Sequence, residues 1–309
     1  MTNEKAADAG GNCFELRPWR CPICGQNQER VLGMRGGKFQ RHGLGIPNKI
    51  VQCRQCSLIY PNPFPVPVNA QKLYGDPGKY FVRAQDQEAM VGRNRKTLHE
   101  LRKKLGKPKF QLLDIGCGRG EMLEAAKREG IPGVGLEFSK AMIESASAKY
   151  GVTALDVPIE EYAMANQATV DGFCLNGIIE HVYDPDSMVA AMSKLAAPGA
   201  VVYVDVPNEP NIITRSGNLL NRLTGSQAVY NLSPSWSPYH VYGFNTKALG
   251  LLFKKHGFAI VEVNVFAAPY IPAGPSVKDK VKSFVGSQII RLGNLTGTAT
   301  NMVVWARKE

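Results

Sequence analysis

The stretch from residue 111 to 137 constrains the fold of this chain more than any other. A short apolar run, 112–115, ends in the glycine-rich turn 116–120; a helical stretch follows, and a second apolar run ends at Glu137. In such a strand–turn–helix–strand unit the glycines let the backbone approach a ligand, and the acid can bind ribose hydroxyls. The spacing is G-x-G-x-G and Asp114 precedes the first glycine, which favours a nucleoside-like ligand without a pyrophosphate. A glycine-rich turn in an unrelated α/β protein is the alternative.

Short apolar runs alternate with helical stretches through the rest of the chain. The predicted strands cover residues 112–115, 131–136, 152–155, 170–175, 200–206, 259–266 and 302–306. Strands that alternate with helices form a parallel sheet with right-handed crossovers. A helix over 86–105 precedes the first strand and ends at Gly106. We therefore predict an α/β fold over 86–309, with a Rossmann-like, seven-stranded, mostly parallel sheet and helices on both faces.

Four cysteines near the N-terminus form two C-x-x-C pairs, Cys21 with Cys24 and Cys53 with Cys56. Two such pairs place four thiolates where two tight turns can converge on Zn²⁺ as a tetrahedron. Two disulfides are a poor alternative in a reducing cytosol, and a redox pair would need a βαβ context that this region lacks. We predict a zinc-ribbon-like module over 13–60 in which the metal is structural, because protein groups fill all four positions.

Four segments lie outside these patterns. Residues 1–12 are polar and are predicted to be a disordered tail, and the proline-rich residues 61–85 are predicted to be an extended connector. Residues 207–243 follow the carboxyl end of a strand and carry several aromatic residues, which predicts a loop that covers the ligand crevice. Residues 276–292 have the pattern of a basic amphipathic helix. For this helix, packing on the core or on a second subunit is favoured over contact with a membrane surface.

The positive charge of the chain is confined to its N-terminal third. Residues 1–110 hold 20 Lys and Arg against 8 Asp and Glu, a balance of +12, whereas residues 111–309 hold 17 against 18, a balance of −1. A basic region implies an anionic partner, such as nucleic acid, a phosphorylated substrate or an acidic membrane surface, or else a solvated surface. The N-terminal residues lack the apolar stretch of a signal peptide, and no apolar run is long enough to span a membrane. A cytoplasmic location is therefore expected.

With these residues in place, the chain resembles the class I S-adenosylmethionine (SAM) dependent methyltransferases. The resemblance rests on Asp114, the glycines of 116–120, Glu137 and Asp156, which occur in this order with the spacing of that family. It implies a Rossmann-like fold, SAM as the methyl donor and transfer of a methyl group as the reaction.

Further stretches extend the resemblance over about residues 111–265. The sequence GIIEHVYDP, 177–185, is similar to the region after the fourth strand of small-molecule methyltransferases of the ubiquinone-biosynthesis type. One departure is the AAPGA turn at 196–200, where the family usually has Lys-Pro-Gly-Gly. A four-cysteine zinc-binding module followed by a proline-rich connector resembles bacterial methyltransferases that modify sugars in surface-polysaccharide or natural-product pathways.

The resemblance implies nine cofactor-binding residues: Asp114, Gly116, Cys117, Gly118, Glu137, Phe138, Asp156, Val157 and Asn176. Asp114 would serve the methionine ammonium, directly or through a water molecule, and Gly116 and Gly118 would give the backbone clearance beside the ligand. The peptide that ends at Asn176 would close on the sulfonium side.

The remaining residues of this set would bind the adenosine. Glu137 would accept hydrogen bonds from both ribose hydroxyls. Phe138 would line the adenine ring, and Asp156, with Val157 beside it, would take the adenine amine. An ordinary acid at a strand end is the alternative for Glu137 or Asp156 taken alone.

Methyl transfer from a sulfonium is an in-line displacement, so positioning is its main requirement, and an alcohol or activated carbon also benefits from a general base. His240 and His181 are the candidate bases, with Tyr239 and Tyr242 as positioning partners. His240 is favoured by its place in the aromatic loop, whereas His181 has the alternative role of holding a loop carbonyl. A different possibility is a divalent cation bound by one acidic segment: Glu180, His181, Asp184 and Asp186.

Three functions are compatible with the sequence. The first is methyl transfer from SAM to a small hydroxylated acceptor, a sugar or nucleotide-linked sugar, at an oxygen, carbon or nitrogen atom. The second is methylation of RNA at a ring nitrogen or ribose, with the basic zinc module gripping phosphates. Residues 176–179, NGII, differ from the Asn/Asp-Pro-Pro-aromatic motif of enzymes that methylate exocyclic base amines, and no Pro-Cys motif occurs. The third, a non-enzymatic zinc module with a vestigial domain, is disfavoured by the intact Asp114, Glu137 and Asp156.

Overall fold

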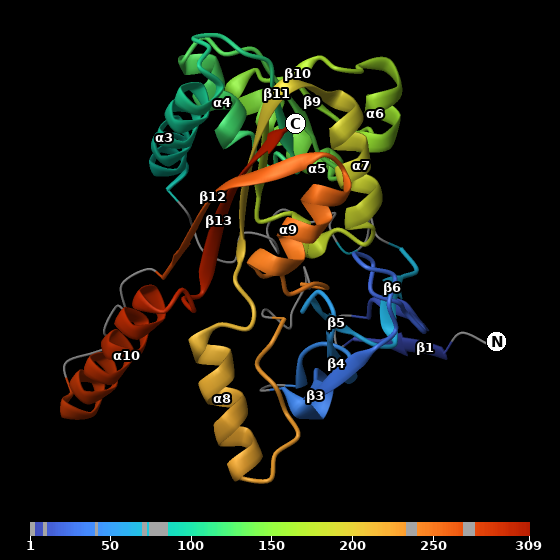
Figure 1. Ribbon diagram of the computed structural model, residues 1–309, viewed down its shortest axis with the longest axis vertical. Coiled ribbons are helices and arrows are strands. Elements are labelled where there is room, and N and C mark those ends of the chain that lie inside the picture. Colours follow the sequence, from blue (N-terminus) through green and yellow to red (C-terminus); the bar gives the residue numbers. More distant parts are fainter. Residues whose placement is uncertain are drawn as a thin grey trace.

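The computed structural model describes residues 4–8, 11–40, 43–69, 73, 86–232, 240–267 and 276–309. Figure 1 shows a sheet with helices on both sides in the upper half of the view and a smaller group of N-terminal strands below it. Two helices, α8 (Ile212–Leu223) and α10 (Val277–Leu295), extend away from the sheet at the bottom of the same view.

A seven-stranded sheet forms the centre of the molecule, in the order β12-β13-β11-β10-β7-β8-β9. Its strands are β7 (Leu112–Ile115), β8 (Gly133–Leu136), β9 (Ala154–Leu155), β10 (Val170–Asn176), β11 (Ala196–Pro207), β12 (Phe258–Phe266) and β13 (Asn301–Lys308). β13 pairs antiparallel with both neighbours, and the other pairs are parallel. β7 and most of β11 are buried, as expected of apolar strands covered on both faces. The predicted mostly parallel, seven-stranded sheet is confirmed.

Helices cover both faces of this sheet (Figure 1). One face carries α3 (Gln87–Leu105) and α4 (Glu121–Arg128), and the other carries α6 (Ile159–Ala165), α7 (Pro185–Leu195) and α9 (Thr246–Lys255). Helix α5 (Lys140–Tyr150) follows β8. Polar side chains begin several of these helices; Asp86, for example, accepts hydrogen bonds from the amides of Glu88 and Ala89 at the start of α3. Gly106 ends α3 with a left-handed φ of 67°.

The N-terminal region, which we call the N-terminal module, contains two small antiparallel sheets. One contains β3 (Glu29–Arg35), β4 (Asn48–Cys53) and β5 (Ile59–Pro61), and the other contains β1 (Glu4–Ala7), β2 (Cys13–Arg17) and β6 (Phe64–Pro67). A short 3₁₀ turn, Gly37–Phe39, follows β3.

Two strands of the module differ from the predicted disordered tail and extended connector. β1 lies within residues 1–12, and β6 lies within residues 61–85. Both strands pair with β2 through backbone hydrogen bonds. Such bonds form without alternating apolar side chains, so a polar or proline-rich segment can still be a strand. β6 is an edge strand, where prolines are tolerated because one side of the strand has no partner.

The module packs directly against the main domain. Ile59 and Gly243 exchange two backbone hydrogen bonds, of 3.1 and 2.8 Å. The Trp19 ring stacks on Phe64 with centroids 4.7 Å apart, and its indole N–H donates to the Tyr242 hydroxyl at 3.2 Å. Cys21, Cys53 and Cys56 share one hydrophobic core with residues of the central sheet, and the partly buried Cys24 packs against it. The two parts of the chain are therefore packed as a unit.

Residues 207–243 differ from the predicted loop, because α8 occupies much of their first half. Asn211 begins this helix by accepting hydrogen bonds from the amides of Ile213 and Thr214. The chain then returns along β3, where the Val229 amide donates to the Met34 carbonyl at 2.9 Å. Residues 233–239, which include the candidate Tyr239, lie outside the described residues.

Helix α10 forms where an amphipathic helix is predicted, but its apolar face is not buried. Ser276 begins it by accepting a hydrogen bond from the Asp279 amide at 3.1 Å. Phe284 and Val281 are 67% and 58% exposed. Packing on the core therefore does not account for this face. No helix among the described residues has the length and apolarity needed to cross a membrane.

Part of the basic excess of residues 1–110 is neutralised within the chain. The pairs join α3, or the turn after it, to acids of the main domain: Arg95 and Arg102 with Glu129, Lys104 with Glu262, and Lys107 with Asp171. Such surface pairs add little stability, at most about 1 kcal/mol each. They do reduce the number of unpaired cations that are available to bind an external anion.

Candidate functional site

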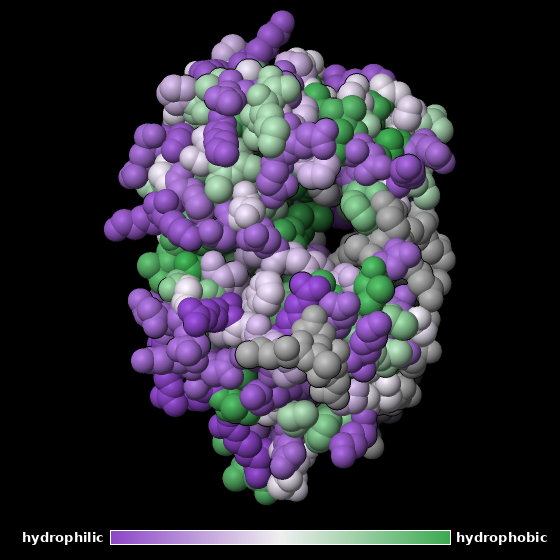
Figure 2. Space-filling model, turned by 90° about the vertical axis from the view of Figure 1, so that its right-hand side faces the viewer, coloured by the Kyte–Doolittle hydropathy of each residue, from purple (hydrophilic) through white to green (hydrophobic). Residues whose placement is uncertain are grey.

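A cleft opens at the carboxyl ends of β7, β8 and β10, the edge of the sheet where ligands bind in folds of this type. Its volume of about 560 Å³ lies within the range of small-molecule sites. Figure 2 shows the molecule hollowed near its middle, with hydrophobic residues in the floor of the hollow and hydrophilic residues around it. All nine residues predicted to bind the cofactor line the cleft: Asp114, Gly116, Cys117, Gly118, Glu137, Phe138, Asp156, Val157 and Asn176.

The glycine-rich turn brings the backbone to the floor of this cleft. Gly116 has φ of +70°, a left-handed conformation that side chains disfavour. A Cβ atom built at this position would lie 2.2 Å from Cδ1 of Ile178, so even alanine does not fit without a shift. The amides of Gly116 and Cys117 donate to the Leu136 carbonyl at 2.8 and 3.1 Å. This bonding ties the turn to the end of β8.

Glu137 stands at the end of β8 with its carboxylate held by two backbone amides. One oxygen, Oε2, accepts from Gly118 N–H at 2.9 Å, and the other, Oε1, accepts from Ser139 N–H at 2.9 Å. An ionised carboxylate has about four acceptor sites, so two amides leave room for two further donors. The geometry therefore fits an acid that takes both hydroxyls of a ribose.

Asp114 is the most deeply placed acid of the cleft, at 3% exposure. Burial, followed by the nearby charges of Glu137 and Glu121, raises the pKa of Asp114 to about 8. A positively charged group bound beside it would favour the ionised form and lower this pKa. The site therefore suits a ligand that carries an ammonium group.

The lining of the cleft is acidic as a whole. Its carboxylates are Asp114, Glu121, Glu137, Asp156 and Glu160. The cation described among its lining residues, Arg119, donates to Glu121 Oε1 at 2.9 Å. SAM carries a sulfonium and an ammonium, so the donor set and the charge of the cleft fit this cofactor.

Two lining residues from α3 were not predicted to belong to the site. Met90 and Asn94 reach the cleft from this helix, which the sequence indicates only as a packing element. The buried positions of α3 are Val91, Asn94, Leu98 and Leu101. The amide of Asn94 in this otherwise apolar stripe is the signal that could have indicated a site, because a buried polar side chain needs a partner.

A second group, Glu180, His181 and His240, lies at one end of the cleft. The 3₁₀ turn Ile179–His181 places His181 in the lining, whereas His240 lines a small neighbouring cavity of about 50 Å³ instead. The two imidazole rings meet edge to face with centroids 4.7 Å apart. The backbone carbonyl of Glu180 holds the next segment by accepting from the amides of Val241 and Tyr242 at 2.9 and 3.1 Å.

The side chain of Glu180 is buried next to these rings. It is 3% exposed, and its Oε2 has no hydrogen-bond partner among the described residues. Burial is the main cause that raises the pKa of Glu180 to about 8. For His240, burial and the nearby His181 and Arg35 hold the pKa well below its usual range, so this imidazole is neutral at pH 7. An acid with one unpartnered carboxylate oxygen beside two imidazoles is an arrangement that attracts a proton or a cation.

The structure does not assemble the cation site predicted from residues 180–186. Asp184 begins α7 and accepts from the Ser187 amide at 3.0 Å, and Asp186 is bonded to Lys255 and His256 at 2.8 Å. Both acids therefore have structural roles. The group whose ligand atoms lie within 4.8 Å of one another is instead Glu180, His181 and His240. Of the predicted positioning tyrosines, Tyr242 donates to the Tyr183 carbonyl at 3.1 Å and so holds the loop in place.

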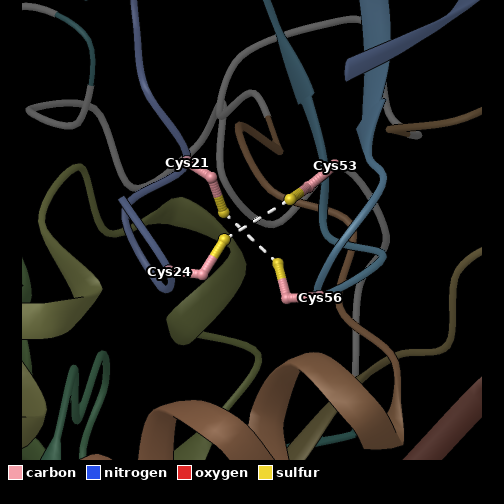
Figure 3. Close-up of side chains that lie close together, drawn as sticks. All are labelled: Cys21, Cys24, Cys53 and Cys56. Carbon is pink, nitrogen blue, oxygen red and sulfur yellow. Dashed lines mark hydrogen bonds between the residues drawn. The ribbon is translucent and has the colours of Figure 1, made fainter. Parts of the chain in front are cut away.

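The four cysteines of the N-terminal module converge as their spacing predicts. Figure 3 shows their sulfur atoms pointing toward one another from two turns of the chain. Cys21 Sγ lies 3.3 Å from Cys56 Sγ, and Cys24 Sγ lies 3.5 Å from Cys53 Sγ. All four lie within 4.8 Å of one another. Tetrahedral zinc with Zn–S bonds of about 2.3 Å requires sulfurs roughly 3.8 Å apart, so the cluster fits the metal.

Comparisons with known proteins agree with this geometry. Residues 84–263, more than half of the chain, match a family described as a methyltransferase domain. Ubiquinone biosynthesis O-methyltransferases from Pseudoalteromonas translucida and Vibrio cholerae are 32% and 34% identical over 104 and 103 residues. Each match covers 32% of this chain, and the matched stretch spans 44% and 42% of the relatives, less than half of their length.

Among solved structures, a SAM dependent methyltransferase from Archaeoglobus fulgidus is similar with a TM-score of 0.51 at 18% identity. The similarity covers 78% of this chain and 100% of the other. At this level of identity it shows that the fold is shared.

Proposed function

Because the chain belongs to the methyltransferase domain family, we propose that it transfers the methyl group of SAM to an oxygen of a small hydroxylated acceptor, a sugar or nucleotide-linked sugar. The observation that carries this proposal is the cleft, which gathers all nine predicted cofactor-binding residues around one volume. The choice of oxygen is supported by the names of the curated relatives, which are O-methyltransferases. The sugar class rests on the four-cysteine module that precedes the domain.

The residues of the cleft would hold the two ends of the donor. Bound SAM supplies an electrophilic methyl group on a sulfonium. Asp114, once ionised, would receive the ammonium, and Glu137 would receive the ribose hydroxyls while Gly118 and Ser139 N–H keep its carboxylate in place. A donor held at both ends in this way would be fixed in one orientation, which is the main requirement of an in-line transfer.

His181 is the group best placed to accept a proton from the acceptor hydroxyl. It lines the cleft, whereas His240, which the sequence favours slightly, stands behind it against the N-terminal module. We propose that His181 is the general base and that His240 holds the His181 ring in position. A positioned imidazole base contributes about 10²–10⁴ in rate.

We further propose that Cys21, Cys24, Cys53 and Cys56 hold a structural zinc ion. All four ligands come from the protein, and the cluster lies in the hydrophobic core rather than in the cleft. Zinc at this position would stabilise the part of the N-terminal module in which Trp19 and Ile59 contact the segment after His240.

A divalent cation at Glu180, His181 and His240 is a second candidate for how the acceptor is activated. The unpartnered Oε2 of Glu180 and the 4.8 Å grouping of the three side chains favour it. A cation held by these groups would lower the pKa of a bound acceptor hydroxyl. Dialysis against EDTA, followed by a methyl-transfer assay with and without added Mg²⁺ or Mn²⁺, tests this role. Full activity of the dialysed protein would leave His181 as a base without a metal.

The alternative of RNA methylation has less support than the basic N-terminal third suggests. Four cations of α3 and the turn after it, Arg95, Arg102, Lys104 and Lys107, are paired with acids of the same chain. Their charge is therefore not fully available to a phosphate backbone.

Transfer of labelled methyl from SAM into a fractionated cell extract tests the proposed function. We expect label in the nucleotide-sugar or glycan fraction, and loss of that label with the Glu137→Ala variant. Ribonuclease-sensitive label would support the RNA alternative instead. Label in a lipid-soluble quinone fraction would instead agree with the ubiquinone biosynthesis for which the curated relatives are named, and would contradict the sugar class.

A further inference from the structure

A second large cavity lies where the N-terminal module, α8 and α9 meet. Its volume is about 580 Å³. Four cationic side chains line it: Arg30, Arg215, Arg222 and Lys247. Among the described residues of its lining there is no carboxylate, and most of the others are amides, hydroxyls or small residues. It shares no lining residue with the acidic cleft.

The cations reach this cavity from three separate elements. Arg215 and Arg222 are seven residues apart on α8, with Asn218 and Leu219 between them, so these four side chains form one face of the helix. Arg30 comes from β3 of the N-terminal module, and Lys247 comes from the first turn of α9. Packing of the two parts of the chain is what brings these charges together.

None of the four cations has an ion-pair partner among the described residues. Arg30 donates to the Gln52 side-chain oxygen at 2.7 Å, and Arg215 donates through Nε to the Pro210 carbonyl at 3.3 Å. Both guanidinium groups keep further N–H donors, since each has five. This arrangement contrasts with that of Arg95, Arg102 and Lys104 on α3, which are paired with acids. All four side chains are exposed to solvent, where water and salt screen part of their mutual repulsion, and a bound anion would relieve the rest.

The first turn of α9 adds backbone donors to the same cavity. Asn245, Thr246 and Lys247 all line it. The Asn245 side chain accepts from the Ala248 amide at 3.0 Å, while the amides of Thr246 and Lys247 are at positions that have no partner within the helix. Together with the positive end of the helix dipole, such amides favour an anionic group.

A buried acid, Glu209, is bonded to Asn231 of the cavity lining but does not itself line the cavity. Its carboxylate accepts from the Asn231 side-chain amide at 3.0 Å and from the Leu232 amide at 2.8 Å. Those hydrogen bonds hold the segment after α8 in place.

We infer that this cavity binds a ligand with a diphosphate group, of the size of a nucleoside diphosphate. Two linked phosphates carry several negative charges, and arginine binds phosphate oxygens in pairs through its planar fork. The side chains of Gln52 and Asn208, which also line the cavity, can contact the uncharged part of the ligand. A hollow of limited volume suits a compact anion better than a continuous nucleic-acid strand. The inference does not depend on the acceptor proposed above, because it concerns a separate site.

Isothermal titration calorimetry with the full zinc-loaded chain tests this inference. Uridine diphosphate and inorganic pyrophosphate are the probes. In the R215Q/R222Q double variant we expect the affinity for uridine diphosphate to fall at least about tenfold, as loss of charge-assisted hydrogen bonds predicts. The matched control is Arg93→Gln, an exposed arginine of α3 outside the cavity, which should leave the affinity unchanged.

The probes and variants separate the possible outcomes. Equal binding of both probes would support a site for the diphosphate alone, and tighter binding of uridine diphosphate would support a nucleoside-linked one. Lys247→Gln, a second variant on another element, should weaken binding in the same direction. Unchanged SAM affinity in all variants would show that the fold and the cleft are intact. Equal affinity in the wild type and R215Q/R222Q, or binding of a single-stranded RNA oligonucleotide without binding of either probe, would overturn the inference.

Discussion

The acidic cleft and the basic cavity have almost the same size and opposite charge. The cleft, about 560 Å³, is lined by five carboxylates and by one described cation that is bonded to one of them. The cavity, about 580 Å³, is lined by four cations and, among the described residues, by no acid. A cationic sulfonium cofactor is attracted to the first and repelled by the second. The contrast teaches that, in one chain with a net charge of +11, the local charge of a site can differ in sign from that of the whole chain.

The two sites also differ in how the chain builds them. The cleft is made by residues between Met90 and Met188, within the methyltransferase domain alone. The cavity draws on residues from Arg30 to Thr298, so it exists only because the N-terminal module packs on the main domain. Substitutions in the cleft should therefore leave the cavity intact. Loss of the N-terminal module should disrupt the cavity and leave the cleft intact.

The largest effect is expected from His181→Asn. This change removes the proposed base but leaves the SAM contacts and the cavity intact, so the rate of methyl transfer should fall by about 10²–10⁴. SAM affinity and diphosphate affinity should stay within a factor of about two, within the error of such comparisons. Steady-state assays and calorimetry measure these quantities. The control is His99→Asn, an exposed histidine of α3. Normal turnover of the His181→Asn variant would contradict the proposed role of His181 as the general base.

A smaller but still large effect is expected from Glu137→Ala. Without the carboxylate, two ribose hydroxyls lose a charged acceptor, and SAM affinity should fall by about 100-fold. Glu161→Ala, an exposed acid of α6 outside the cleft, is the matched control and should change nothing. Calorimetry with SAM measures both. An equal loss in diphosphate affinity would mean that the two sites are not independent.

Removal of the zinc should act mainly on the cavity. Chelation would release Cys21, Cys24, Cys53 and Cys56, loosen the module that carries Arg30, and lower the diphosphate affinity by about tenfold for the lost charged contacts. Limited proteolysis should then cut within residues 13–60, whereas SAM affinity should change little. Unchanged protease resistance of this region after chelation would contradict a structural role for the metal.

The smallest effect is a dependence of SAM affinity on pH. The pKa of Asp114 is raised to about 8, mainly by burial, so the acid is mostly protonated at pH 7 and half ionised near pH 8. The ammonium of SAM prefers the carboxylate, so affinity should increase roughly fivefold from pH 7 to pH 8. Asp114→Asn should bind more weakly and lose this dependence. A wild-type SAM affinity that does not change between pH 7 and pH 8 would contradict a contact between the ammonium and Asp114.

Local motifs explain why the cleft could be predicted from the sequence. The turn 116–120, Glu137 and Asp156 follow successive strands, and the carboxyl ends of parallel strands meet at one edge. The cysteine pairs are likewise short motifs whose geometry is set by their own turns. In both cases the residues that act together are near in sequence or are linked by a repeating unit.

The remainder of the site depends on contacts that no local pattern encodes. His240 lies beside His181 because the segment after 239 is bonded to the Glu180 carbonyl, about 60 residues earlier in the chain. Sequence order does not say which of two neighbouring rings faces a ligand. Likewise, Arg215 and Arg222 lie on α8, and no local pattern indicates that this helix shares a hollow with Arg30 of β3 and Lys247 of α9.

The place of β13 has a consequence for how the protein is made. β13 lies between β11 and β12 and is the antiparallel partner of both, although it follows both in the chain. During synthesis, therefore, those two strands emerge from the ribosome with no partner between them, and each exposes an unpaired edge until residues 301–308 arrive. Such edges are the surfaces on which nascent chains aggregate or recruit chaperones. Because of this strand order, the nascent chain is most prone to aggregation in the interval before Asn301 has been synthesised.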